Sequence, residues 1–124
     1  MLRTRAYRAL AVTAFAGALA RPGVADAHAI ILEAEPAMND AVAGPDVQIR
    51  LRFNSRIDHK RSRLTLVDPA GETRPLVIDK AAAEDMLAAR AASLVPGAYR
   101  IRWQVLAVDG HITRGDVPFT VARP

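Results

Sequence analysis

Two stretches of the chain alternate apolar and polar residues without a break, and this pattern constrains the fold more than any other feature. The apolar members are Val47, Ile49, Leu51 and Phe53 in the first stretch and Tyr99, Ile101, Trp103 and Val105 in the second. Arginine and glutamine occupy the positions between them. A two-residue period places every second side chain on one face of an extended strand. Both stretches therefore predict β-strands with one buried face and one wet face.

Turn residues divide the rest of the chain into further short strands. Residues 64–67 and 74–78 flank Asp68-Pro69-Ala70-Gly71, which predicts a hairpin because Pro and Gly suit turn positions. Residues 117–121 predict a terminal strand, with Pro118 at an edge or a strand start because proline cannot donate to a ladder. Six or seven such strands indicate an all-β fold, an immunoglobulin-like antiparallel β-sandwich with Greek key connections and about seven strands.

Residues 80–92 are ambiguous. Their alanine-rich sequence has strong helix propensity, yet the neighbouring segments are all short strands, and tertiary context overrides propensity in segments of this length. Two structures stay open: one or two helical turns, or a loop followed by a strand around residues 86–88.

The beginning of the chain is typical of a secretory signal peptide. Arg3, Arg5 and Arg8 precede an uncharged apolar run of 12 residues from Ala9 to Ala20, and Ala25-Asp26-Ala27 fits the small-residue cleavage pattern. A helix that spans a bilayer needs about 20 apolar residues, so a lasting anchor is the weaker interpretation. This leader would direct export to the periplasm, and cleavage after Ala27 would release a mature domain of residues 28–124.

The composition of the mature region excludes several classes of function. The leader holds four of the 17 basic residues and one of the 13 acidic residues, so the mature chain has a net charge of +1 and no bulk preference for nucleic acid or anionic lipid. The absence of cysteine excludes disulfides, thiolate metal sites and a catalytic thiol. With 97 residues, the mature chain is expected to form one domain.

Histidine at the predicted mature amino terminus is a candidate metal ligand. After cleavage, His28 would offer its free amine and its own imidazole Nδ1 to one ion, forming a chelate from a single residue. Histidine is a common metal ligand, but its position there could also be chance, or cleavage could fall elsewhere.

Asp109-Gly110-His111 is the second candidate cluster, directly after the predicted strand 99–105. Residues two apart in an extended chain face the same side, and Gly110 allows a close approach of the backbone. Together with His28, Asp109 and His111 would supply three nitrogens and one oxygen. Such a set suits copper(II) better than tetrahedral zinc or oxygen-bound calcium and magnesium. A plain Asp-Gly turn with a surface histidine is the structural alternative.

The remaining candidates are weaker. His59 lies in a charged stretch and is at most an auxiliary ligand, while Met38 and Met86 are too few and too isolated for a copper(I) site. The chain contains no G-x-S-x-G, H-E-x-x-H or phosphate-binding glycine loop, so no catalytic role is predicted.

Together these features resemble the CopC family of periplasmic copper-resistance proteins. The likeness is carried by His28-Ala29, Pro36-Ala37, the stretch 45–53, Leu94-Val95-Pro96-Gly97-Ala98-Tyr99, Trp103-Gln104-Val105, Asp109-Gly110-His111 and Phe119-Thr120-Val121. The resemblance implies a small β-sandwich that binds copper(II) through the mature amino-terminal histidine. Carried over residue by residue, the family's ligands fall on His28, Asp109 and His111.

The chain departs from the family pattern in two places. Where members often have Phe-Ser-Glu, this chain has Phe53-Asn54-Ser55, so a carboxylate that can lie near copper is missing. The methionine-rich loop of some members is absent, which implies a form that binds copper(II) alone. Some relatives are fused to a membrane domain of the CopD type, and this chain has no such extension. The resemblance therefore implies a free soluble carrier, for which an inner-membrane transporter of the CopD type is a candidate partner.

Two other functions are kept as alternatives. An amino-terminal histidine with a second histidine also occurs in polysaccharide mono-oxygenases, which are oxidative copper enzymes. A metal-free immunoglobulin-like interaction domain is the third hypothesis. The main prediction is a non-enzymatic periplasmic copper(II) carrier or buffer in copper homeostasis or resistance.

Overall fold

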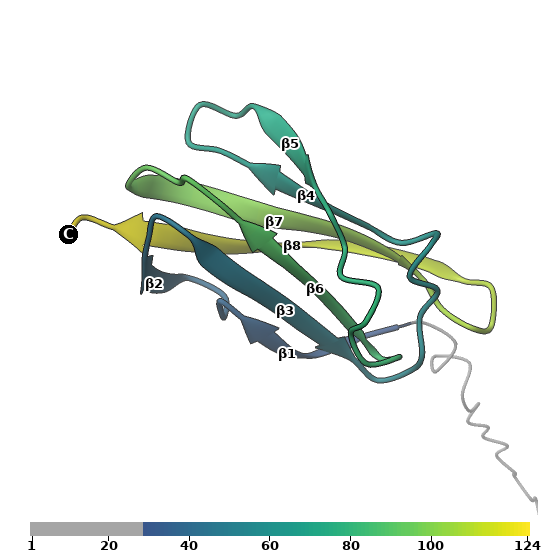
Figure 1. Ribbon diagram of the computed structural model, residues 1–124. Coiled ribbons are helices and arrows are strands. Elements are labelled where there is room, and N and C mark those ends of the chain that lie inside the picture. The colour runs from purple at the N-terminus through teal and green to yellow at the C-terminus, as the bar shows by residue number, and fades with distance from the viewer. Residues whose placement is uncertain (1–28) are drawn as a thin grey trace, which may run out of the picture.

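The computed structural model describes residues 29–124, which form two β-sheets packed face to face (Figure 1). The predicted leader, residues 1–27, and His28 lie outside the described residues. The eight strands are β1 (Ile31–Glu35), β2 (Asp40–Ala43), β3 (Val47–Phe53), β4 (Arg63–Val67), β5 (Thr73–Leu76), β6 (Met86–Ala91), β7 (Gly97–Leu106) and β8 (Ile112–Ala122). The three-stranded sheet has the order β1-β3-β6, and the five-stranded sheet has the order β2-β8-β7-β4-β5.

The two alternating stretches form the centres of the two sheets, as predicted. In β3 the apolar residues are at most 5% exposed, and Ile101 and Val105 of β7 are fully buried. Phe53 and Trp103 meet across the sandwich with ring centroids 5.2 Å apart in an edge-on arrangement. Fully burying one such side chain contributes about 1.5–3 kcal/mol, so these facing stripes hold the layers together.

The predicted antiparallel β-sandwich is confirmed, with eight strands where about seven were expected. The sequence did not predict β1 and β2, because β1 has no clean alternation and β2 has only four residues. β2 runs parallel to the end of β8, whereas the other strand pairs in the described chain are antiparallel.

The ambiguous segment 80–92 contains a loop followed by β6, so the helical alternative is wrong. β6 pairs along its whole length with residues 47–52 of β3 in antiparallel register. Leu87, Ala89 and Ala91 are buried against the core. The strand is favoured because it satisfies the hydrogen bonds of β3 and buries these side chains, which a helix of this length could not do.

Pro118 does not stand at the start of a strand, which was one of the two positions predicted for it. It lies inside β8, which begins at Ile112 and not at residue 117. β2 pairs with β8 only from Phe119 onward, and the carbonyl of Pro118 accepts the Asn39 N–H at 2.6 Å. Pro118 therefore stands where one side of β8 changes from an open edge to a paired strand, a place where a missing N–H does no harm.

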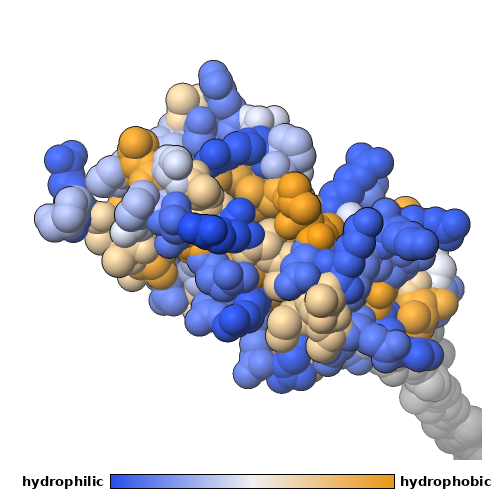
Figure 2. Space-filling view, viewed as in Figure 1, coloured by the Kyte–Doolittle hydropathy of each residue, from blue (hydrophilic) through white to orange (hydrophobic). Residues whose placement is uncertain are grey.

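The surface seen in this orientation is mostly hydrophilic (Figure 2). Hydrophobic side chains gather in a band near its middle and at the end where the described chain begins. Ile30 and Leu32, in that first segment, are each 53% exposed. No helix within residues 29–124 is long and apolar enough to cross a membrane.

Candidate metal centre

A tight turn between β7 and β8 presents Asp109 and His111. The Ala107 N–H donates to the His111 carbonyl at 2.9 Å, and the Gly110 N–H donates to the Ala107 carbonyl at the same distance. Gly110 has a φ of +90°, which side chains rarely adopt, so glycine is required at this position. The two candidate ligands are thus brought together by a turn and not by the alternation of an extended strand.

The side chains of Asp109 and His111 contact each other directly. Nδ1 of His111 lies 3.2 Å from Oδ2 of Asp109, and the His111 N–H donates to Oδ1 of Asp109 at 3.0 Å. Two donors at right angles, each about 2.0–2.1 Å from one metal ion, are about 3 Å apart. The pair therefore has the spacing of neighbouring ligands on a single ion, and both side chains are partly exposed to solvent.

The start of the described chain is held by Asn54. The Ile30 N–H donates to Oδ1 of Asn54 at 2.9 Å, and the Asn54 N–H donates to the Ile30 carbonyl at 3.0 Å. Ala29, one residue earlier, is 1% exposed and belongs to the hydrophobic core. Two hydrogen bonds and the burial of Ala29 therefore fix the position of the first two described residues.

The segment 54–58 joins this entry point to the turn that carries Asp109 and His111. The Asp58 N–H donates to the Leu106 carbonyl at 2.9 Å, and the Val108 N–H donates to the Arg56 carbonyl at 3.2 Å. Ile57 forms a bridge with Ala107. One connector of five residues thus bonds at one end to Ile30 and at the other to the turn.

Asn54 holds the entry of the chain, and the sequence did not indicate this role. Against the family pattern, the stretch Phe53-Asn54-Ser55 indicated only that a carboxylate is missing at position 55. A polar residue directly after a strand is a weak signal of capping, and sequence alone cannot show that its partner is Ile30, which lies 24 residues away.

His59 has a different neighbour from the predicted pair. Its Nε2 lies 2.8 Å from the carbonyl of Met86, at the free edge of β6. The next outward carbonyl of β6, that of Ala88, accepts the Asp79 N–H at 2.8 Å. His59 thus helps to cover an open strand edge. Within residues 29–124, no three histidine, aspartate, glutamate or cysteine side chains gather at one point.

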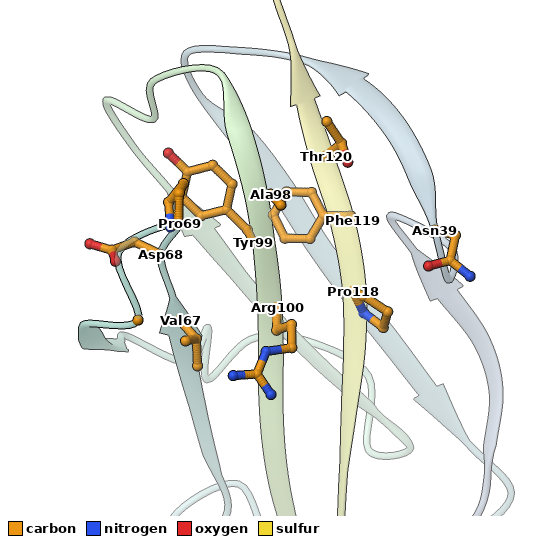
Figure 3. Close-up of a pocket in the computed structure, with 11 residues that line it drawn as sticks. Asn39, Val67, Asp68, Pro69, Ala98, Tyr99, Arg100, Pro118, Phe119 and Thr120 are labelled. Atoms are coloured by element: carbon orange, nitrogen blue, oxygen red, sulfur yellow. The ribbon is translucent and has the colours of Figure 1, made fainter.

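A hollow of about 450 Å³ on the outer side of the five-stranded sheet is unrelated to these ligands (Figure 3). Val67, Asp68, Arg100 and Pro118 are among the residues that line it, whereas Asp109 and His111 do not. The candidate metal centre is therefore a surface turn and not a cavity.

Comparison with known proteins identifies the family. A CopC domain model matches residues 31–122. Protein YobA of Escherichia coli strain K12 is 32% identical over 98 residues, which cover 77% of this chain and 79% of YobA. Copper resistance protein C of Pseudomonas syringae pv. tomato is 28% identical over 118 residues, which cover 89% of this chain and 93% of that protein.

The fold gives the same result. The crystal structure of CopC from Methylosinus trichosporium OB3b superposes with a TM-score of 0.68 at 30% sequence identity, and the match covers 77% of this chain and 94% of that one. Residues 31–122, which the family model matches, contain both sheets and the turn with Asp109 and His111. Because the family model, the sequence relatives and the fold all agree, the chain belongs to the CopC family.

Proposed function

We propose that this protein is a periplasmic carrier or buffer for copper(II), acting in copper homeostasis or resistance. The observation that carries the proposal is the 3.2 Å contact between His111 and Asp109, on a turn bonded through residues 54–58 to the first described residues. The family of copper-resistance proteins to which the chain belongs supports the same role.

The third ligand in this proposal is His28. It is bonded covalently to Ala29, and consecutive Cα atoms are about 3.8 Å apart. Ala29 is buried and Ile30 is held by Asn54, so the described chain begins at a defined place next to the connector. Removal of residues 1–27 would expose the amine of His28, so that amine and imidazole could complete a set of three nitrogens and one oxygen.

The donor types support copper(II) over copper(I). Imidazole, amine and carboxylate are nitrogen and oxygen ligands, which suit a tetragonal copper(II) site. Copper(I) prefers thiolates and thioethers, but the chain has no cysteine. Met38 lies before β2 and Met86 begins β6, so no methionine cluster forms in the described residues. Copper is cargo in this proposal, and a CopD-type transporter would exchange it with the protein.

Calorimetry on two forms of the protein tests the proposal. Protein that begins at His28 should bind one copper(II), and protein with one extra amino-terminal residue should bind far more weakly, because its terminal amine is displaced. Equal affinity would refute the amine-imidazole chelate. Mass spectrometry of exported protein should show His28 as the first residue, and any other terminus would undo this site.

Three further measurements separate the alternatives. Affinity should fall below about pH 6–7, because amine and imidazole nitrogens bind copper only when deprotonated. Electron paramagnetic resonance should show nitrogen coupling, which a metal-free interaction domain would lack. Ascorbate-driven peroxide turnover should not exceed that of free copper, whereas an oxidative enzyme would exceed it clearly.

A further inference from the structure

The outer face of the five-stranded sheet concentrates positive charge. Alternation along the strands places Arg63 of β4, Arg100 and Arg102 of β7, and Arg114 of β8 on the side opposite the core. Strand register confirms the shared side, because Arg63 and Arg114 both lie opposite Gln104. We call these four residues the arginine face.

The carboxylates on this face do not neutralise it. Asp116 lies opposite Arg102 and is the one acidic residue on this side of β4, β7 and β8. Its carboxylate contacts Nη1 of Arg100 at 3.0 Å and Nε of Arg102 at 3.4 Å. Arg63 forms no ion pair within residues 29–124. Four guanidinium groups therefore share this face with Asp116 and with Asp68, which directly follows β4 and lines the same outer hollow as Arg100.

Hydrogen bonds hold these side chains in place. Nε of Arg114 donates to Oε1 of Gln104 at 2.8 Å, and Asp116 bridges the two arginines of β7. Figure 3 shows Arg100 in one row with Val67 and Pro118, across three strands. Arg100, Arg102 and Arg114 are thus held before any partner arrives, which lowers the entropy cost of binding.

The opposite face of the molecule is balanced. Arg50 pairs with Glu35 at 3.2 Å, Arg52 pairs with Glu33 at 2.7 Å, and Arg90 pairs with Asp46. Each arginine there has its own carboxylate. The net charge of +1 for residues 28–124 thus conceals an asymmetry, with the positive field on one sheet.

A basic hollow and an apolar pair of side chains lie next to the arginine face. A hollow of about 480 Å³ beside β4 is lined by Arg63, Lys60 and Lys80, with no acidic residue in its lining. At the other side, Leu106 and Ile112 continue the same row and end at the turn with Asp109 and His111. Ile112 is 52% exposed. A partner on this face would contact an apolar pair directly beside the candidate metal centre.

We propose that the arginine face is a docking surface for an acidic protein. Guanidinium groups match carboxylates in a fork geometry, and arginine is enriched in protein interfaces. The apolar pair beside the arginines adds the dry contact that a protein interface needs. Docking here would bring the acidic partner next to the turn of β7 and β8.

The test uses metal-free protein and a fluorescein-labelled dodecapeptide of alternating glutamate and serine, with binding followed by fluorescence anisotropy. The double variant R63Q/R114Q should bind about three- to tenfold more weakly, because each exposed pair contributes only a fraction of a kcal/mol. The matched control R50Q/R52Q removes the same charge from the balanced face and should bind within about twofold of the unchanged protein. At about 0.1 M salt, charges more than about 10 Å away are screened.

Three results would overturn the proposal. One is no peptide binding by the unchanged protein, and another is equal weakening by the two double variants, which would indicate net charge alone. The third is tighter binding to vesicles of phosphatidylglycerol and phosphatidylcholine than to the peptide, which would assign the face to a membrane. Circular dichroism verifies that both variants fold. Because no metal is present, none of these outcomes bears on the copper(II) proposal.

Discussion

Asn54 and Ile30 exchange two hydrogen bonds, one through the Asn54 side chain and one through its backbone. This pair fixes where the chain enters the sandwich, at one end of the connector whose other end bonds to the turn of Asp109 and His111. In the proposed copper(II) site, the carboxamide of Asn54 would therefore support the amino-terminal ligand without touching the metal.

Asn54→Ala should weaken copper(II) binding about tenfold, because supporting residues around metal sites typically contribute 10- to 100-fold to affinity. The variant should also lose about 0.5–1.5 kcal/mol of unfolding free energy. Calorimetry and urea denaturation measure the two effects. Ser55→Ala is the matched control, since its hydroxyl makes only a 3.3 Å contact with the adjacent Arg56 carbonyl. Equal affinities for the two variants would remove Asn54 from the site.

His111→Ala should reduce copper(II) affinity by at least about 100-fold, since it removes a proposed ligand and not a supporting group. His59→Ala is the control with the same chemical change. It should leave copper affinity unchanged and lower the free energy of unfolding by about 0.5–1.5 kcal/mol, because the Met86 carbonyl loses its partner. The reverse pattern, with copper binding lost in His59→Ala, would move the site to the edge of β6.

Gly115→Ala should destabilise the fold by about 1–3 kcal/mol through overpacking. Gly115 lies opposite Trp103 in the β7–β8 register, and an added Cβ would come within 2.5 Å of the indole ring. Thermal unfolding measures the loss. In a Trp103→Phe background the same change should cost less, because the smaller ring leaves room. An equal cost in both backgrounds would show that the indole is not the cause.

The Asp46 carboxylate should contribute stability that depends on pH. The Ser93 N–H, followed by the Arg90 guanidinium, holds the pKa of this carboxyl below its ordinary value. Because folding favours the ionised form, the stabilisation is complete above the unfolded-chain pKa of about 3.9 and is lost as the pH falls through the lower folded-state pKa.

Urea denaturation at several pH values checks this expectation. The stability difference between the unchanged protein and Asp46→Asn should be present at pH 6 and should shrink below about pH 4. Glu72→Gln, which removes a carboxylate without an ion pair in the described residues, should show no such difference. If the stability difference between the unchanged protein and Asp46→Asn persisted at pH 2, ionisation of Asp46 would not be its cause.

Much of the fold was predictable because the hydrophobic period is a local property. Val47 to Phe53 and Tyr99 to Val105 alternate so regularly that no helix could bury them, and Pro and Gly mark the 68–71 hairpin. The segment 80–92 was not predictable, since its alanines favour a helix locally and only the open edge of β3 makes β6 the better structure.

The candidate site divides in the same way. Sequence alone determined that the chain has no thiolate, and it predicted His28, Asp109 and His111 as nitrogen and oxygen ligands. Only the tertiary structure decided that a turn with Gly110 brings them into contact, that His59 faces Met86, and that Asn54 connects the chain entry to this turn. Contacts between residues distant in sequence depend on packing, which local patterns do not encode. The arginine face has the same origin, because a net charge says nothing of which sheet carries it.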